Sequence, residues 1–183
     1  MPPELWQSVN TLLVLDWVGD RTAEMQLNPA LQVLHHTLPE AAITLLAVKE
    51  ARHESLSLDC QWQSLAQFCS GSTTPDHPTF IENSWVQLIQ KIRDRAFDAA
   101  IIFTAPSQSP YSLAYLCYLA GIPIRIGQSR EFGGGVLSFC IQPPLEPVPL
   151  QDYYLHLLKS AGFPIEEPID AKFTHVFVPA ASA

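Results

Sequence analysis

The chain has 183 residues, of which 48% are hydrophobic, and it carries 18 Asp and Glu against 10 Lys and Arg, a net charge of −8. This length suits one full domain, and the apolar content supports a buried core, which excludes an intrinsically disordered chain. The acidic balance excludes the basic surface that nucleic acids require. No apolar run approaches the roughly 18 residues of a membrane-spanning helix, and the N-terminal residues are unlike a signal peptide. We therefore expect a cytoplasmic protein with no transmembrane segment and no nucleic-acid partner.

The N-terminal part of the chain predicts a strand–helix–strand unit. Residues 11–18 form a continuous apolar run, which is typical of a buried parallel strand. Asn28 and Pro29 predict the N-cap and the first turn of a helix that Pro39 ends. A second buried strand is expected over 42–48, so that the unit forms a right-handed crossover.

The rest of the chain continues this alternation, although residues 52–82 give no clear pattern. The elements that we predict further along are a helix beginning at Ser84, a strand over 97–103, a polar loop over 104–110, a helix over 111–120 closed by Gly121, a strand over 122–126, a glycine-rich loop over 127–135, a helix over 150–161 that ends at Gly162 and a strand-like segment over 174–178.

Strands and helices that alternate with short connections indicate an α/β fold. We expect a Rossmann-like, mostly parallel sheet with helices on both faces. Ligands bind such sheets at the carboxyl ends of the strands, so the loops over 17–28, 104–110 and 127–135 are the candidate site.

Several short segments follow one another in an order that resembles a known family. They are Gly19-Asp20 after the first strand, Pro29–Leu31 in the first helix, Leu38–Leu45, Arg95–Phe103, Leu119–Gly127 and Ser160–Phe163. Together they resemble glycosyltransferase family 9, the heptosyltransferases of lipopolysaccharide core synthesis.

The resemblance implies the first half of a GT-B glycosyltransferase, in which two Rossmann-like domains face each other across a cleft. In that family the first domain takes the acceptor, and the second binds a nucleotide-sugar donor such as ADP-heptose without a metal. Residues 1–163 would form the acceptor-side domain, and residues 164–183 a linker or the start of the second, missing domain. No cofactor is expected in this chain itself, because the donor would bind the absent domain.

Asp20 matches the position of the family's catalytic base. Inverting glycosyl transfer needs a carboxylate that accepts the proton of the attacking hydroxyl, although Gly-Asp is also an ordinary turn pair. Eight residues, 21–28, separate Asp20 from Pro29, more than the family has. Either this loop contains an insertion or Glu24 occupies the carboxylate position, so Glu24 is the second candidate.

Arg130 matches an arginine that faces anionic acceptor groups in the family, and a guanidinium suits phosphate or carboxylate because it donates two parallel hydrogen bonds. Ser107, Gln108 and Ser109 lie in the segment that resembles the acceptor loop. The alternatives are a solvated surface role for Arg130 and capping of the following helix by Ser107 or Ser109. Arg125 fits a strand position and is expected to be structural.

Some cationic positions of the family are missing. Val148 and Asp152 stand where the family often has His and Arg, and no Lys or Arg occurs between Arg52 and Lys91. We therefore keep two hypotheses. The first is the acceptor-binding half of an inverting glycosyltransferase, inactive without its donor domain. The second is a non-catalytic relative that binds a protein or a saccharide. A small Rossmann enzyme with its own nucleotide is less well supported, because the chain lacks a phosphate-binding motif.

The partner expectations rest on the same reasoning. We expect a saccharide acceptor and either a donor-domain polypeptide or a second copy of the chain, docked through an apolar face; peripheral membrane contact is compatible with the resemblance. The four cysteines lack metal-site spacing and are expected to be buried reduced thiols. The six histidines form no metal-ligand pattern either.

Overall fold

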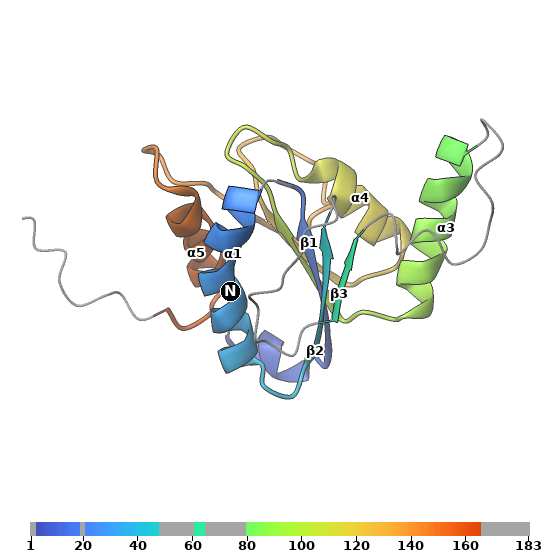
Figure 1. The fold of residues 1–183 in the computed structure, drawn as a ribbon, viewed down its shortest axis with the longest axis horizontal. Helices are drawn as coiled ribbons and strands as arrows, with labels where there is room; N and C mark the ends of the chain where they lie inside the picture. Colours follow the sequence, from blue (N-terminus) through green and yellow to red (C-terminus); the bar gives the residue numbers. More distant parts are fainter. Residues whose placement is uncertain (1–2, 19–20, 48–60, 65–79, 166–183) are drawn as a thin grey trace, which may run out of the picture.

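The computed structural model describes residues 3–18, 21–47, 61–64 and 80–165, which form one six-stranded sheet (Figure 1). All neighbouring strands are parallel, and their order is β3-β2-β1-β4-β5-β6. The strands are β1 (Thr11–Asp16), β2 (Ala42–Ala47), β3 (Gln61–Ser64), β4 (Ala99–Phe103), β5 (Ile124–Gln128) and β6 (Phe139–Ile141). This order is that of a Rossmann fold, in which the winding reverses between β1 and β4. The predicted fold class is confirmed.

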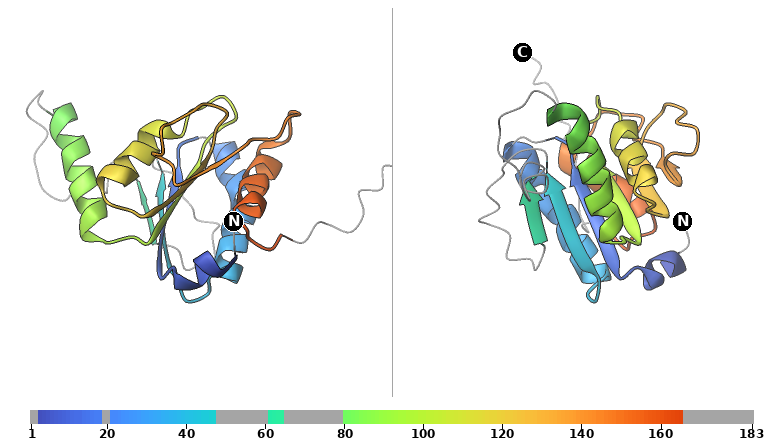
Figure 2. Two further views of the ribbon diagram at one scale, coloured as in Figure 1. Left: turned by 180° about the vertical axis from the view of Figure 1, so that it is seen from behind. Right: turned by 90° about the vertical axis from the view of Figure 1, so that its right-hand side faces the viewer.

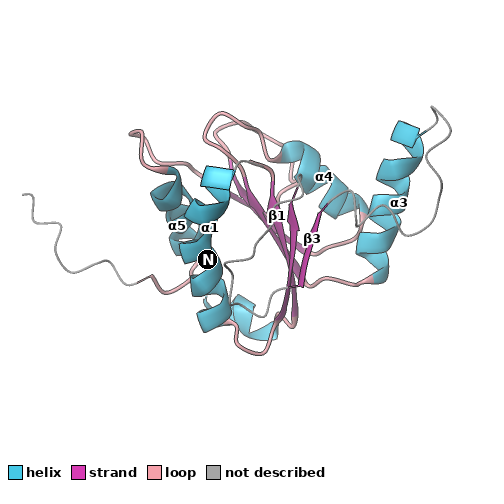
Figure 3. Ribbon diagram, in the orientation of Figure 1, coloured by secondary structure: helices cyan, strands magenta, loops and turns pink. Residues whose placement is uncertain are grey.

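Helices cover both faces of the sheet, as Figures 2 and 3 show. On one face, α1 (Arg21–Thr37) lies beside α5 (Leu150–Ser160). On the other face, α3 (Phe80–Asp94) and α4 (Tyr111–Leu119) pack against the sheet. A short 3-10 helix, η1 (Pro3–Ser8), precedes β1. None of the helices in the described part of the chain is long and apolar enough to cross a membrane.

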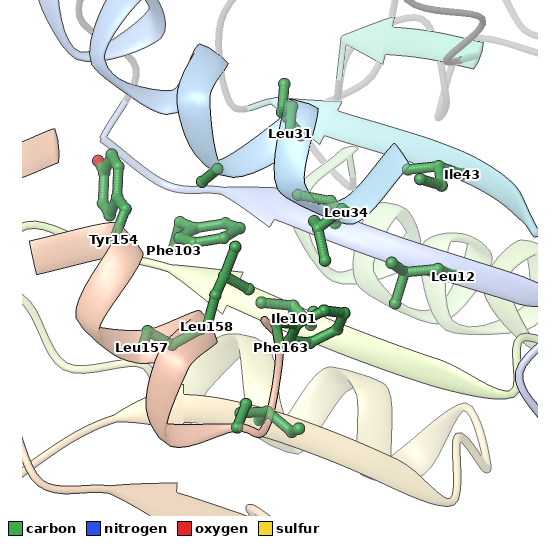
Figure 4. Close-up of a cluster of buried hydrophobic side chains, with 14 of the residues drawn as sticks. Leu12, Leu31, Leu34, Ile43, Ile101, Phe103, Tyr154, Leu157, Leu158 and Phe163 are labelled. Carbon is green, nitrogen blue, oxygen red and sulfur yellow. The ribbon is translucent and has the colours of Figure 1, made fainter. Parts of the chain in front are cut away.

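Strand β4 is apolar along its whole length, and β1 from Leu12 to Leu15, because both faces of these strands are covered. The buried side chains of β1 and β4 divide alternately between two clusters. Leu12 and Ile101 belong to the cluster under α1 and α5, whereas Leu13 and Ile102 belong to the cluster under α3 and α4. Figure 4 shows the first cluster, in which the ring of Phe103 meets that of Tyr154 edge-on with centroids 5.1 Å apart.

The N-terminal segment closes onto the end of the last described helix. The indole Nε1 of Trp6 donates a hydrogen bond to the carbonyl oxygen of Ala161 over 2.8 Å, and its ring lies 4.3 Å from that of Phe163. Trp6 is buried in the cluster that α1 and α5 cover. The two ends of the described chain are therefore held by the same core.

Glycine ends two helices in the predicted way. Gly121 and Gly162 adopt φ values of +86° and +94°, a conformation that glycine reaches without a steric penalty. At the first end, Ile122 N–H donates to the Cys117 carbonyl and Gly121 N–H to the Tyr118 carbonyl. Gly162 and Phe163 repeat this pattern at the end of α5. These bonds satisfy carbonyls that the helices themselves leave unpaired.

The predicted start of the first helix is wrong. Helix α1 begins at Arg21, so Asn28 and Pro29 lie inside it rather than at its N-terminus. Pro29 has no N–H to donate to the carbonyl of Met25 one turn earlier. The helix continues through Pro29 without that hydrogen bond. Residues 21–28, expected as a lengthened loop, are helical.

Other element boundaries also differ from the prediction. Strand β5 starts at Ile124 rather than at 122, because Pro123 lacks the N–H that a ladder hydrogen bond needs. Helix α3 starts at Phe80, four residues before Ser84. The three-residue edge strand β6 was not predicted, since so short a segment shows no periodicity. The strand-like segment 174–178 lies outside the described residues.

The two described cysteines differ in environment. Cys117 is buried, and burial raises the pKa of its thiol to about 12 against the opposing charge of Arg125. Cys140 is an exposed free thiol on β6, so the expectation that it is buried is wrong. It lies on an edge strand, which is less covered than the centre of the sheet. Cys60 and Cys69 are outside the described residues. Among the residues that are described, no group of His, Cys, Asp or Glu side chains could hold a metal ion.

Asp98 joins the beginnings of β1 and β4. Its Oδ2 accepts hydrogen bonds from the backbone N–H groups of Asn10 and Thr11, both over 2.9 Å, and from the Thr11 hydroxyl over 3.0 Å. Burial raises the pKa of Asp98, but these hydrogen bonds outweigh burial and hold it below its ordinary value. The ionised carboxylate therefore stabilises the folded state.

We predict that Asp98→Ala lowers the free energy of unfolding by about 2 kcal/mol, because two backbone N–H groups lose a charged acceptor. The pKa is lower in the folded state, so this contribution is complete above the unfolded pKa of about 3.9 and is lost as the pH falls through the folded value. Urea denaturation at about pH 7 and about pH 3 measures both effects. Asp94→Ala is the control, since Asp94 only accepts a bond from Gln90 on the surface of α3. An equal loss in the free energy of unfolding in Asp98→Ala and Asp94→Ala would contradict the prediction.

Candidate functional site

A pocket of about 500 Å³ opens at the carboxyl ends of β4 and β5. Three segments enclose it: the loop after β4, the end of β5 with the residues after it, and the proline-rich connection between β6 and α5. The lining residues are Pro106, Ser107, Gln108, Ser109, Gln128, Ser129, Arg130, Glu131, Pro143, Pro144, Leu145, Glu146, Pro147, Val148 and Tyr153. This is the edge where parallel α/β sheets bind their ligands.

Gln108 holds the loop after β4 in a closed turn. Its side-chain Oε1 accepts a hydrogen bond from the backbone N–H of Ala105 over 3.0 Å. The backbone N–H of Gln108 in turn donates to the Ala105 carbonyl over 2.9 Å. The next polar residue, Ser109, donates from Oγ to the Glu131 carboxylate over 3.4 Å. Ser109 Oγ also accepts from the N–H of Tyr111 at the start of α4, over 3.5 Å. The N-cap residue of α4 is Pro110, without a side-chain cap hydrogen bond, so the alternative that Ser107 or Ser109 caps this helix is wrong.

Arg130 reaches across the pocket. Its Nη2 donates to the carbonyl oxygen of Pro144 over 2.6 Å, which ties the loop after β5 to the proline-rich connection. Burial raises the pKa of the Tyr153 phenol, and the positive charge of the Arg130 guanidinium partly opposes this increase. Arg130 is thus an exposed residue with a fixed position in the pocket wall.

Gln128 forms a buried part of the lining that the sequence pattern does not reveal. It is 2% exposed, and its Nε2 donates to the Tyr153 carbonyl over 2.9 Å. Its Oε1 is buried and has no hydrogen-bond partner in the part of the chain that the structure describes. The signal was a polar residue at the end of an apolar strand, but the predicted strand stopped at Ile126 and left Gln128 in the loop.

Tyr111 supports the glycine-rich loop after Arg130. Its hydroxyl donates to the Glu131 carbonyl, and its ring lies against the backbone of Gly133. Burial has the largest effect on the pKa of Tyr111 and raises it. A hydrogen bond with the Ser129 side chain lowers this pKa, whereas Cys140 and Glu131 raise it further. A second pocket of about 290 Å³ lies here, beside the first, with Arg130 and Glu131 in both linings.

More buried polar groups lie where the strands end. Asp16, the last residue of β1, is 3% exposed, and its Oδ1 accepts from the N–H of Val18 over 3.1 Å. Burial raises the pKa of Tyr154, and the negative charges of Asp16 and Tyr153 raise it further. The Tyr154 hydroxyl and the hydroxyl of Thr104, just after β4, are buried without a partner. The sequence pattern places Asp16 inside a strand and gives no reason to single it out.

Arg125 has the structural role that the sequence predicts. It is buried, with Nε donating to the Val136 carbonyl over 2.6 Å and Nη1 donating to the carbonyls of Ile122 and Pro123, the latter over 3.0 Å. Its guanidinium carbon also lies 5.3 Å from the ring centroid of Tyr118. These bonds hold the turn before β5, and Arg125 does not line the pocket.

The structure brings the four predicted acceptor-binding residues together, since Ser107, Gln108, Ser109 and Arg130 all line the first pocket. Asp20 lies outside the described residues. Glu24 falls in the first turn of α1, but its side chain is outside the described part.

The positions that correspond to the family's missing cationic pair also lie near the pocket. Val148 lines it, and Asp152 lies in the first turn of α5 beside the lining residue Tyr153. An apolar and an acidic residue therefore occupy positions where a cation would favour an anionic ligand.

No family model matches the chain, and no curated protein sequence matches it. Among solved structures, the chain is similar to the glycosyl transferase family 9 from Veillonella parvula DSM 2008, with a TM-score of 0.54 and 13% identity over 84% of this chain and 41% of that one. It is also similar to the E. coli ADP-heptose lps heptosyltransferase II, with a TM-score of 0.52 and 20% identity over 80% of this chain and 39% of that one.

The chain thus spans about two fifths of the length of each of these structures. At such identities the likeness concerns the fold. The resemblance that the ordered sequence segments predicted is confirmed at that level: this chain has the fold of part of a family 9 glycosyltransferase.

We predict that Gly133→Ala destabilises the protein by about 1–3 kcal/mol, because the added Cβ would overlap the ring of Tyr111. In a Tyr111→Ala background this penalty should largely disappear, and chemical denaturation of the four proteins of the cycle measures the coupling. Gly134→Ala is the control. Its φ of +60° makes alanine unfavourable, but no atom lies within 4 Å of the added Cβ, so its penalty should not depend on Tyr111. Additive effects at Gly133 and Tyr111 would disprove the contact.

Proposed function

We propose that this chain is the acceptor-binding half of an inverting glycosyltransferase similar to family 9. In this proposal the chain binds a saccharide and transfers no sugar until a donor-binding domain is supplied. The pocket carries the proposal, because it gathers Ser107, Gln108, Ser109 and Arg130 at the carboxyl edge of a Rossmann-like sheet. The shared fold with two family 9 structures supports it.

Exposed apolar side chains at the same edge support a second domain. Leu145, in the lining of the first pocket, is 92% exposed, and Phe132, in the lining of the second, is 97% exposed. Met25 is 74% exposed near the start of α1, which comes after the carboxyl end of β1. Apolar groups exposed to this degree at one edge indicate a surface that another unit covers. A donor domain facing the pocket would cover them.

Asp20 remains our choice for the catalytic base. It precedes Arg21, the first residue of α1, and so comes after the carboxyl end of β1 in the chain. A carboxylate in that position would accept the proton of the acceptor hydroxyl as the hydroxyl attacks the anomeric carbon. The nucleotide leaving group, from a donor such as ADP-heptose, would be held by the second domain. Glu24 is the alternative base.

One observation favours a second candidate function, a non-catalytic saccharide-binding module. Val148 lines the pocket where the resemblance calls for a cationic side chain. A relative that no longer holds a charged acceptor in a reactive position would tolerate this change. Such a module would bind its saccharide without any need for a donor domain.

Binding measurements on the purified chain test the proposal. Isothermal titration with a panel of neutral and phosphorylated saccharides, and separately with ADP-heptose, should give saccharide binding and no nucleotide-sugar binding. Binding of ADP-heptose alone would overturn the assignment to the acceptor side. Reading the DNA downstream of codon 183 then separates the two candidates: a frame for a second α/β domain supports the half-enzyme, and its absence from the neighbouring genes supports the binding module.

For the assembled enzyme, we predict that Asp20→Asn lowers the transfer rate at least about 100-fold, since it removes the general base. Asparagine caps helices as well as aspartate does, so the substitution tests chemistry rather than folding at the residue before α1. The measurement is sugar transfer with both domains present, together with the thermal midpoint. Glu24→Gln is the matched variant. If it abolishes transfer while Asp20→Asn does not, Glu24 is the base instead.

A further inference from the structure

The hydrogen-bonding groups of the first pocket define the chemical class of its ligand. We infer that the pocket takes an uncharged, hydroxyl-rich saccharide rather than a phosphorylated or carboxylated one. This inference rests on the proposed function and specifies the substrate class of the same site. It is carried by one buried, unpaired hydrogen-bond acceptor in the lining, by the sign of the charges there and by the apolar walls.

The buried amide oxygen of Gln128 requires a donor. Because Nε2 of the same amide donates to the Tyr153 carbonyl, the orientation of the amide is fixed and Oε1 remains the unpaired acceptor. A buried acceptor without a partner is unfavourable, and because Gln128 lines the pocket, a ligand hydroxyl that reached Oε1 would remove this penalty. A fully ionised phosphate or carboxylate group carries no hydrogen to donate, and its negative charge would repel Oε1.

The charged groups of the lining are mostly acidic. Glu131 and Glu146 contribute two carboxylates, and Arg130 is the one basic residue among the lining residues that the structure describes. Arg130 already donates to the Pro144 carbonyl over 2.6 Å, so an anion would have to share or displace that bond. Carboxylates accept hydrogen bonds from sugar hydroxyls, whereas they repel phosphate.

Other described cations lie away from this edge. Lys91 and Arg93 occupy the last turn of α3, Arg95 directly follows that helix, and Lys159 lies in the last turn of α5. Both helices run antiparallel to the strands, so their last turns lie at the amino edge of the sheet, opposite the pocket. Arg125 is buried and bonded to backbone carbonyls. Within the described part of the chain, the pocket therefore receives little positive charge beyond that of Arg130.

The walls of the pocket suit the non-polar face of a sugar ring. Proline side chains from two segments line it together with the Tyr153 side chain. Sugar rings present C–H faces between their hydroxyls, and these faces pack on apolar rings while the hydroxyls reach polar groups. The proline residues of the lining are Pro106, Pro143, Pro144 and Pro147.

Matched pairs of sugars test the inference on the full chain. The pairs are glucose with glucose 6-phosphate, maltose with maltose 1-phosphate, and trehalose with trehalose 6-phosphate, titrated into ¹⁵N-labelled protein at low ionic strength. We expect the neutral member of at least one pair to shift the side-chain amide signals of Gln128 and the guanidinium signal of Arg130. Its phosphorylated partner should bind at least about fivefold more weakly, as expected for repulsion by a nearby carboxylate.

Two variants separate the hydrogen bond from the charges. Gln128→Met keeps the side-chain length but removes Oε1, and should weaken binding of the neutral sugar about fivefold to tenfold. The double variant Glu131→Gln and Glu146→Gln should strengthen binding of the phosphorylated sugar about fivefold or more, because two repulsive charges are gone.

Glu40→Gln is the charge control: Glu40 is exposed between α1 and β2 at the amino edge, so this variant should bind both sugars as the parent does. Backbone amide spectra show whether each variant is folded. If Gln128→Met does not fold, the double variant still tests the inference.

The outcomes are distinguishable. Preference for the neutral sugar, lost in Gln128→Met, supports both the inference and the proposed function. Preference for the phosphorylated sugar at the same residues overturns the inference and leaves the proposed function standing. If no saccharide of either kind perturbs Gln128 or Arg130, the inference fails together with the acceptor-binding function.

Discussion

Coverage of the sheet on both faces is the constraint on which the rest of this structure depends. Strands β1 and β4 have no side that meets water, so their side chains are apolar until the strand ends. Polar groups collect at those ends: Asp16 closes β1, Thr104 comes directly after β4 and Gln128 closes β5. The loops that leave the strands carry the remaining polar residues, and the pocket forms where two of these loops meet the proline-rich connection. Coverage of the sheet on both faces therefore determines both the fold and the position of the pocket.

The features that this constraint dictates could be predicted from the sequence, whereas those that depend on distant contacts could not. Apolar runs located β1, β2 and β4, and glycines located the ends of α4 and α5. The start of α1 was missed because Asn28 and Pro29 are typical of a helix start, whereas this helix begins at Arg21 and continues through both residues. The four predicted acceptor-binding residues do line one pocket, since strand ends bring their loops together. Gln128 fell within the predicted loop 127–135 but was not singled out there. Tyr153 and residues 143–148 could not be assigned to the pocket from local patterns, because only the packing of α5 against the sheet brings them there.

The fold and the pocket bear on function in different ways. The chain shares its fold with two solved glycosyltransferase structures and spans about two fifths of their length. In the lining of the pocket, two carboxylates stand against one guanidinium group. The fold alone therefore does not determine the ligand, which depends on the side chains of a few loop residues. Asp20, on which the catalytic proposal depends, has to be tested by its chemistry.

The attachment of Trp6 to Ala161 and Phe163 has a geometric consequence for anything joined to the C-terminal side. Helix α5 begins at the pocket edge and ends at the opposite edge, after 11 residues or about 16 Å of helical rise. The indole hydrogen bond fixes that far end to the core, so the C-terminal end of α5 is held on the side of the molecule away from the pocket. A straight path from that end back to the pocket edge has the length of at least about five extended residues. Any unit joined on the C-terminal side of α5 must therefore be tethered over that distance to face the pocket.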